Sequence, residues 1–192
     1  MKTSLAFLVA VMVFFGTSSL SGQNGFGVEF RPGANFATTE LGDAELETGF
    51  GFEALAEYRF SRYLGVYGGW GWNKFSADQS FAGNKKDFEE SGYLLGLQFS
   101  STGNSNLGFY FRAGGVYNHI EVQSESGNNV ADSKHGIGLR FEVGLDLHLG
   151  SEWYLRPGVK YQELSRDLTV ETITTPVDLK YVSAGFGIAK RF

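Results

Sequence analysis

The chain of 192 residues contains no cysteine and only three prolines. An exported protein without cysteine cannot be a small domain held together by disulfides, and it cannot carry the lipidated cysteine of a bacterial lipoprotein. Its stability must therefore come from packing and from closure of its secondary structure. The 27 glycines and 16% aromatic residues, set against so few prolines, favour many twisted strands over a helical or disordered chain.

The chain also lacks a surplus of positive charge. It has 16 basic and 21 acidic residues, a formal net charge of -5, and its basic residues are scattered. Domains that bind nucleic acid concentrate Lys and Arg on one face or along one helix. The composition therefore excludes nucleic acid as a partner.

One long apolar run stands out, and it lies at the N-terminus. Lys2 precedes an apolar stretch from Leu5 to Phe15, and small and hydroxyl residues follow as far as Gly22. This order predicts a secretory signal peptide. The stretch is too short for a membrane-spanning helix, which needs about 20 apolar residues. We expect a cleaved signal peptide at residues 1–22 and a single domain at residues 23–192.

The rest of the chain lacks the apolar period of an amphipathic helix, and apolar residues recur instead at every second position. The run from Ile137 to Leu149 is the clearest, because its apolar residues alternate with Arg140, Glu142 and Asp146. A period of two is typical of β-strands. We expect strands at residues 25–36, 49–60, 63–76, 88–99, 107–122, 137–149 and 152–165, and in a closing run that ends at Phe192.

The closing run indicates which face of the sheet is apolar and which is polar. Phe186 and Ile188 lie on an apolar face, whereas Gly185, Gly187 and Arg191 lie on the opposite one. A strand with its apolar side outward and its small or charged side inward fits a transmembrane β-barrel, in which lipid surrounds the sheet. The sequence therefore predicts an all-β fold, an eight-stranded antiparallel up-and-down transmembrane β-barrel.

The connections between the expected strands alternate in length, with short turns at residues 61–62, 101–106 and 150–151 and longer polar connections at residues 37–48, 77–87, 123–133 and 167–177. An even-numbered barrel with short periplasmic turns and long extracellular loops requires this pattern. Two acidic groups in or beside the long connections could collect divalent cations, but we interpret them as solvated loop charge. They are Asp43, Glu45 and Glu47, and Asp87, Glu89 and Glu90.

A soluble β-sandwich or a lipocalin-like barrel also alternates, but it turns its apolar face inward. Sequence alone does not label inside and outside. Three features favour the membrane barrel. The expected strands are about 11 to 16 residues long, which suits tilted membrane strands; large aromatic residues gather near the strand ends; and the chain ends on the strand-terminal Phe192.

The pattern over residues 23–192, and the closing strand 181–192 above all, resembles the small eight-stranded outer-membrane barrels of the OmpA and OmpX type. The resemblance implies a monomeric protein of a Gram-negative outer membrane, with outer-membrane lipids and lipopolysaccharide around it and a possible surface ligand of its loops. It also implies that Phe192 is the signal read by the outer-membrane assembly machinery. Lys190 departs from an apolar outer face, but its ammonium group can reach the lipid headgroups from the rim.

Eight strands enclose an interior just wide enough for side chains to fill. Charged groups held away from water are tolerated when they are paired. We therefore expect a plugged polar lumen with an ion-pair network in which acids and bases nearly balance. Its expected members are Glu29, Arg31, Glu53, Glu57, Arg59, Arg112, Arg140, Glu142, Asp146, Arg156, Lys160 and Arg191.

These features predict a structural or surface-interaction protein that is not an enzyme and uses no cofactor. A narrow channel or carrier for small molecules is the alternative, and a lipid A-modifying enzyme is a third. Only His119, His135 and His148 could serve a catalytic or metal site, with His148 facing the lumen. His119 and His135 could meet near Glu121, Ser124 or Ser133, but no motif fixes such a set, so we expect neither catalytic nor metal-binding residues.

Overall fold

The computed structural model describes residues 25–101, 106–124, 128–170 and 173–192. The predicted signal peptide lies outside these residues. Within them the chain forms nine strands: β1 (Gly25–Ala37), β2 (Gly49–Arg59), β3 (Leu64–Ala77), β4 (Lys86–Ser101), β5 (Leu107–Ser124), β6 (Asn129–Asp132), β7 (Gly136–Gly150), β8 (Trp153–Val170) and β9 (Ile173–Arg191). The described part of the chain contains no helix long and apolar enough to cross a membrane.

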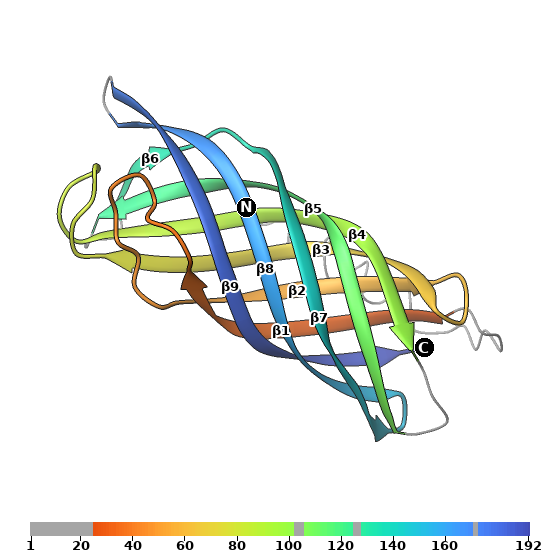
Figure 1. Ribbon diagram of the computed structural model, residues 1–192. Coiled ribbons are helices and arrows are strands. Elements are labelled where there is room, and N and C mark those ends of the chain that lie inside the picture. The colour runs from red at the N-terminus through yellow and green to blue at the C-terminus, as the bar shows by residue number, and fades with distance from the viewer. Residues whose placement is uncertain (1–24, 102–105, 125–127, 171–172) are drawn as a thin grey trace.

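Eight long antiparallel strands close into a barrel (Figure 1). Neighbours along the sequence pair with one another, β5 pairs with β7, and β9 pairs with β1 to close the ring. The short strand β6 pairs only with β5, at the end of the barrel that also carries the β8–β9 hairpin. The C-terminus lies at the opposite end, as an exported barrel with periplasmic termini requires.

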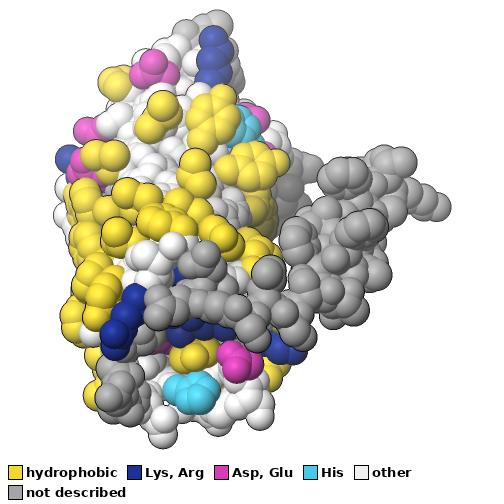
Figure 2. Space-filling view, turned by 90° about the vertical axis from the view of Figure 1, so that its right-hand side faces the viewer, with side chains coloured by type: hydrophobic (Ala, Val, Ile, Leu, Met, Phe, Trp, Pro, Cys, Tyr) yellow, Lys and Arg dark blue, Asp and Glu magenta, His cyan; other side chains and the backbone are white. Residues whose placement is uncertain are grey.

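The apolar side chains of the barrel wall face outward. Leu139, Phe141 and Val143 on β7 are between 45% and 56% exposed, whereas Arg140 and Glu142 between them are 0% and 2% exposed. Figure 2 shows apolar side chains in a belt across the outer wall. A protein that exposes such a belt needs an apolar solvent around it, so the predicted inversion of the sheet is confirmed.

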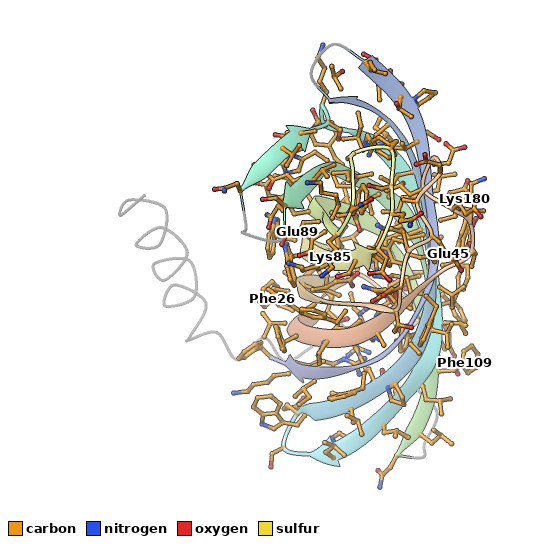
Figure 3. The ribbon with its side chains drawn as sticks, turned by 90° about the vertical axis from the view of Figure 1, so that its left-hand side faces the viewer. Phe26, Glu45, Lys85, Glu89, Phe109 and Lys180 are labelled. Atoms are coloured by element: carbon orange, nitrogen blue, oxygen red, sulfur yellow. The ribbon has the colours of Figure 1, made fainter. Side chains whose placement is uncertain are left out.

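Several charged side chains of the outer surface lie toward the end that carries the long connections. In Figure 3, the labelled Phe26 and Phe109 lie in the lower half of the barrel, whereas Lys85, Glu89 and Lys180 lie in the upper half. The upper half is the extracellular side of a barrel whose termini are periplasmic. The strands therefore project beyond the apolar belt at that end.

The predicted loop at residues 167–177 is wrong. Most of it belongs to β8 and β9, which stay paired as far as Val170 and Ile173. The inward-facing Leu168, Val177 and Leu179 are at most 2% exposed and pack in one apolar cluster. The side-chain contacts in this cluster stabilise the longer strands. The predicted loop at residues 123–133 likewise contains β6, which extends the sheet beside β5.

Replacing Phe141 by Arg tests which side of the sheet meets lipid. A guanidinium group near the middle of the membrane lowers barrel stability by about 2 to 4 kcal/mol, and the same change near an interface costs about 0 to 1 kcal/mol. Urea unfolding of the refolded barrel in lipid vesicles measures the difference. Ile173→Arg is the control, because Ile173 is also apolar and is even more exposed, at 71%, but lies in the extracellular hairpin. Equal losses for both variants would contradict the assigned orientation.

Candidate functional site

The barrel interior holds charged side chains that reach across the lumen. Arg140 of β7 donates to both carboxylate oxygens of Glu53 on β2, at 3.0 and 3.1 Å. Arg112 of β5 donates to Glu29 of β1 at 2.6 Å. In the ring of strands, β7 stands four places from β2 and β5 stands four places from β1. Both contacts therefore join opposite walls of the barrel.

Glu142 and Tyr110 connect these two crossings. Glu142 accepts a hydrogen bond from Arg140 at 2.9 Å, and its other oxygen lies 3.0 Å from a guanidinium nitrogen of Arg31. Arg31 also donates to Glu29 at 2.9 Å. The Tyr110 hydroxyl accepts from Arg31 at 2.6 Å and donates to Glu142 at 2.7 Å. Buried guanidinium and carboxylate groups thus share partners instead of forming isolated pairs, which lowers the cost of their desolvation.

A second group lies nearer the periplasmic end. Arg156 donates to Glu57 at 2.7 Å and to Asp146 at 3.2 Å, and Asp146 accepts from Arg191 at 2.5 Å. Arg156 also donates to Glu29 at 2.8 Å. That bond joins the periplasmic group to the two crossings, so the ion pairs form one connected network.

Eleven of the twelve predicted lumen residues form ion pairs, and all eleven are buried. They are Glu29, Arg31, Glu53, Glu57, Arg112, Arg140, Glu142, Asp146, Arg156, Lys160 and Arg191.

Arg59 is the exception. It is half-buried at the periplasmic end of β2, and it has no ion-pair partner among the described residues. Its strand neighbour Glu57 faces the same way, but the carboxylate oxygens of Glu57 are already bound by Arg156 and Arg191. The expected ion pair of Arg59 is therefore wrong.

A layer of neutral polar groups lies above the network and surrounds Glu90, which is 3% exposed. Its carboxylate accepts hydrogen bonds from Asn73 at 2.8 Å, from Gln162 at 2.7 Å and from the Tyr181 hydroxyl at 2.7 Å, and also from Asn118. The interpretation of Glu90 as solvated loop charge is wrong, because β4 begins at Lys86 and already turns Glu90 inward. Glu90 has the parity of the polar Gln98 and the opposite parity to Leu95 and Leu97, and this is the signal in the sequence that could have shown its inward position.

The extracellular mouth is filled by apolar side chains. Leu41 and Ala44 come from the connection between β1 and β2, are fully buried, and pack in one cluster with Phe75, Phe88 and Leu179. Two backbone hydrogen bonds between Leu41 and Ala44, at 2.9 and 3.0 Å, hold this part of the connection in a tight turn. Below the mouth, a cavity of about 20 Å³ is bordered by Arg31, Asn35 and other lumen residues, which is room for about one water molecule.

The structure brings two of the three histidines together on the outer wall. The rings of His119 and His135 stack with their centroids 4.3 Å apart. Glu121 lies 3.8 Å from His119, as expected, but Ser133 bonds to the backbone of Ile120 instead. The hydroxyl of Ser124 bonds to the backbone of the connection that follows β5.

Two residues that the sequence analysis did not single out contact His119 in place of Ser124 and Ser133. The Oγ of Ser91 lies 3.1 Å from His119 Nε2, and the carboxylate of Asp132 lies 2.8 Å from His119 Nδ1. Both depend on strand pairing, since Ser91 stands opposite His119 across β4 and β5, and Asp132 lies on β6. His148 has the inward parity of Asp146 on β7, but it is exposed at the periplasmic end, where its ring lies 4.9 Å from that of Tyr154.

The extracellular end of the outer wall also carries a charged group on β3 and β4. The ammonium group of Lys74 lies 2.8 Å from Asp87 and 3.4 Å from Glu89. The hydrogen bond to Asp87 is the main reason why the pKa of Lys74 is raised above its usual value. Glu89 in turn accepts a hydrogen bond from the indole of Trp72 at 3.1 Å, so the polar groups of this wall are paired with one another.

Replacing Arg112 by Met tests what the network contributes. The variant leaves Glu29 without one of its guanidinium partners inside the lumen, and removal of one partner of a buried pair costs about 3 to 5 kcal/mol. Urea unfolding of the refolded barrel measures the loss. Arg62→Met, at the exposed β2–β3 turn, is the control and changes the free energy of unfolding by no more than about 0.5 kcal/mol. Similar unfolding of the two variants would show that the network does not hold the barrel together.

Comparison with known proteins agrees with this geometry. No curated protein matches the chain in sequence. Among solved structures, Neisserial surface protein A is 14% identical, with a TM-score of 0.61 over 89% of this chain and 98% of that one. OprG from Pseudomonas aeruginosa is 16% identical, with a TM-score of 0.62 over 86% of this chain and 95% of that one.

The Yersinia pestis attachment invasion locus protein Ail, in complex with the heparin analogue sucrose octasulfate, is 16% identical, with a TM-score of 0.52 over 88% of this chain and 97% of that one. At these identities the structures show a shared fold only. The family described as outer membrane protein beta-barrel domain matches residues 7–192, which is nearly the whole chain. The protein therefore belongs to the outer membrane protein beta-barrel domain family and is a transmembrane barrel of the outer membrane.

Proposed function

We propose that the protein is a sealed, monomeric outer-membrane barrel with a structural and surface-contact role and no enzymatic activity. The observation that carries the proposal is the interior itself. Ion pairs join opposite walls at two places, and above them an apolar cluster fills the extracellular mouth. Ions and solutes then meet a layer of paired charges and, beyond it, a layer of packed apolar side chains.

The alternative function, a narrow channel or carrier, needs a continuous path through the barrel. The cavity of about 20 Å³ beside Arg31 holds no more than about one water molecule. A path would require Arg140 and Arg112 to leave their carboxylates inside a water-poor interior. Because an unpaired buried charge costs several kcal/mol, this opening is unfavourable.

Planar-bilayer recording tests the sealed lumen. The refolded barrel is expected to insert without producing conductance steps above those of the empty bilayer. A 16-stranded porin, which encloses an aqueous channel, is the positive control under the same conditions. Regular steps that scale with the amount of inserted protein would contradict the proposal and favour the channel.

The surface-contact role rests on a hollow of about 640 Å³ at the extracellular end, between the β6–β7 connection and the β8–β9 hairpin. Its lining includes Asp132, Asp167 and Asp178, which outnumber Lys134 and Arg166. A polyanion such as the heparin analogue bound by Ail does not suit this balance of charge. A polar or cationic surface ligand suits it better.

We further propose that the chain is exported by residues 1–22 and that Phe192 guides assembly into the outer membrane. Phe192 is 47% exposed at the periplasmic rim, where its ring lies 6.2 Å from that of Phe26 and 5.0 Å from the ammonium group of Lys190. The chain thus presents an apolar terminus with a neighbouring cation at the edge of the closing strand. Such a terminus is open to recognition before and after the strand pairs with β1.

Deleting Phe192 tests this role. Folded barrels migrate faster than boiled ones on a gel, so the folded fraction in outer-membrane extracts reports assembly. We expect at least a severalfold lower folded fraction for the deletion, and a nearly normal one for Phe192→Tyr, which keeps the aromatic ring. Without Phe192, β9 can still pair with β1 through Arg191. If Phe192 contributed only to stability, the deletion would therefore change the folded fraction little. An unchanged folded fraction would contradict the role of Phe192 as an assembly signal.

A further inference from the structure

A cluster of side chains on the outer wall has no part in the sealed lumen. His119 and Glu121 lie on β5, Asp132 lies on β6, and all three face away from the barrel interior. Figure 3 labels Glu89 on the adjoining strand β4, in the upper half of the barrel. The cluster is therefore on the extracellular side and does not depend on whether the lumen conducts.

The cluster lies just above the aromatic residues of the apolar belt. Tyr93 and Tyr117 face each other across β4 and β5 and are 64% and 52% exposed. Ser91 and His119 form the next outward-facing pair, about 7 Å farther along the same strands toward the extracellular end. Exposed tyrosines mark the lipid–water interface, so the cluster is at the level where water and headgroups replace acyl chains.

The contacts of His119 define the two ends of its ring. Asp132 lies 2.8 Å from Nδ1, and at this distance the ring donates Nδ1–H to the carboxylate. Nε2 is then an acceptor that receives a hydrogen bond from the Ser91 hydroxyl at 3.1 Å, a bond that a metal ion on Nε2 would replace, and Glu121 Oε1 lies 3.8 Å away. The stacked ring of His135 restricts rotation of the imidazole. The lone pair of Nε2 is therefore held in a fixed direction beside a carboxylate.

Ser91, His119 and Asp132 have the distances of a nucleophile, a base and an orienting acid, but the wall lacks the rest of a hydrolase site. An acyl-transfer site needs N–H donors for the oxyanion. Around Ser91 the strand β4 is paired on both sides, so its backbone N–H groups belong to the ladders. The indole of Trp72, opposite Ser91, donates to Glu89. The described neighbours of Ser91 thus leave no pair of donors for an oxyanion.

We propose that His119 and Glu121 bind a divalent transition-metal ion of the zinc class, and that Asp132 positions the imidazole. One ligand atom from each of these three residues lies within 4.8 Å of the other two. The 3.8 Å between Nε2 and Glu121 Oε1 is too long for a hydrogen bond. Two ligand atoms that share a tetrahedral zinc ion are about 3.4 Å apart, so a shift of a few tenths of an ångström completes the pair.

The surroundings suit such an ion. A carboxylate behind a metal-binding imidazole fixes its tautomer and raises its basicity, which is the relation of Asp132 to His119. The Glu121 and Asp132 side chains are 31% and 50% exposed, so water can reach the ion and fill the remaining positions. Two carboxylates near one imidazole also balance the charge of a divalent cation. Nitrogen together with oxygen ligands favours zinc over calcium or magnesium, which prefer oxygen alone.

The test uses the untagged mature barrel, refolded in detergent and dialysed against zinc chloride at neutral pH. We expect one bound zinc ion per chain, and no comparable binding of calcium or magnesium. Glu121→Gln and His119→Gln should each weaken binding at least 100-fold, whereas Asp132→Asn should weaken it about 10- to 100-fold, as loss of a carboxylate behind a metal-bound imidazole does. His148→Gln, at the other end of the barrel, is the control and should bind zinc normally.

The wild-type protein gives a second readout that needs no variant. It has three histidines, so the imidazole NMR signals of His119 can be followed with those of the distant His148 as an internal reference. Zinc should shift the Nε2 signal of His119 and leave that of His148 unchanged. Equal affinity for calcium, binding that survives Glu121→Gln, or zinc shifts at His148 alone would overturn the proposal. Covalent labelling of Ser91 by a fluorophosphonate would also overturn it, in favour of a hydrolase.

Discussion

The contact between guanidinium and carboxylate groups across the lumen is the constraint on which the structure depends. Eight strands enclose a space that only side chains can fill, and outside the barrel there is lipid, so polar groups can only point inward. Long arginines then need carboxylates at matching heights on the opposite wall, and small residues beside them. A methyl group on Gly187 would overlap the carboxylate of Glu29, so glycine at this position leaves the room that Glu29 needs to reach Arg112 and Arg156.

The interior changes character along the barrel axis. The periplasmic half is ionic, a neutral polar layer around Glu90 follows, and the extracellular end is apolar and closed by Leu41 and Ala44. This order matches what surrounds the wall. Where lipid covers the outside the inside is polar, and where the strands project into water the usual arrangement returns, with apolar groups inside. The same eight strands thus carry apolar residues on the outer face within the membrane and on the inner face beyond it.

Much of this could be predicted from alternation alone. The period of two located the long strands, and the polar face of each strand gave a set of inward charges, because parity along a strand fixes which side a residue takes. Parity does not say where lipid ends. The inward Leu168 and Val177 therefore went into a predicted loop, and Glu90 was assigned to solvent. Ser91 and Asp132 meet His119 only through the register of β4 with β5 and the pairing of β6, which no local pattern in the sequence encodes.

The link between Arg140 and Glu53 joins residues 87 positions apart, and the link between Arg156 and Glu29 joins residues 127 apart. Neither can form while the seam between β1 and β9 is open, since water then enters and solvates the charges. Closing the seam and drying the interior are therefore a single event. In a half-zipped sheet these charges stay solvated and unpaired, so the ion pairs stabilise the barrel only once the seam has closed. The charges that plug the finished barrel therefore also favour its last assembly step.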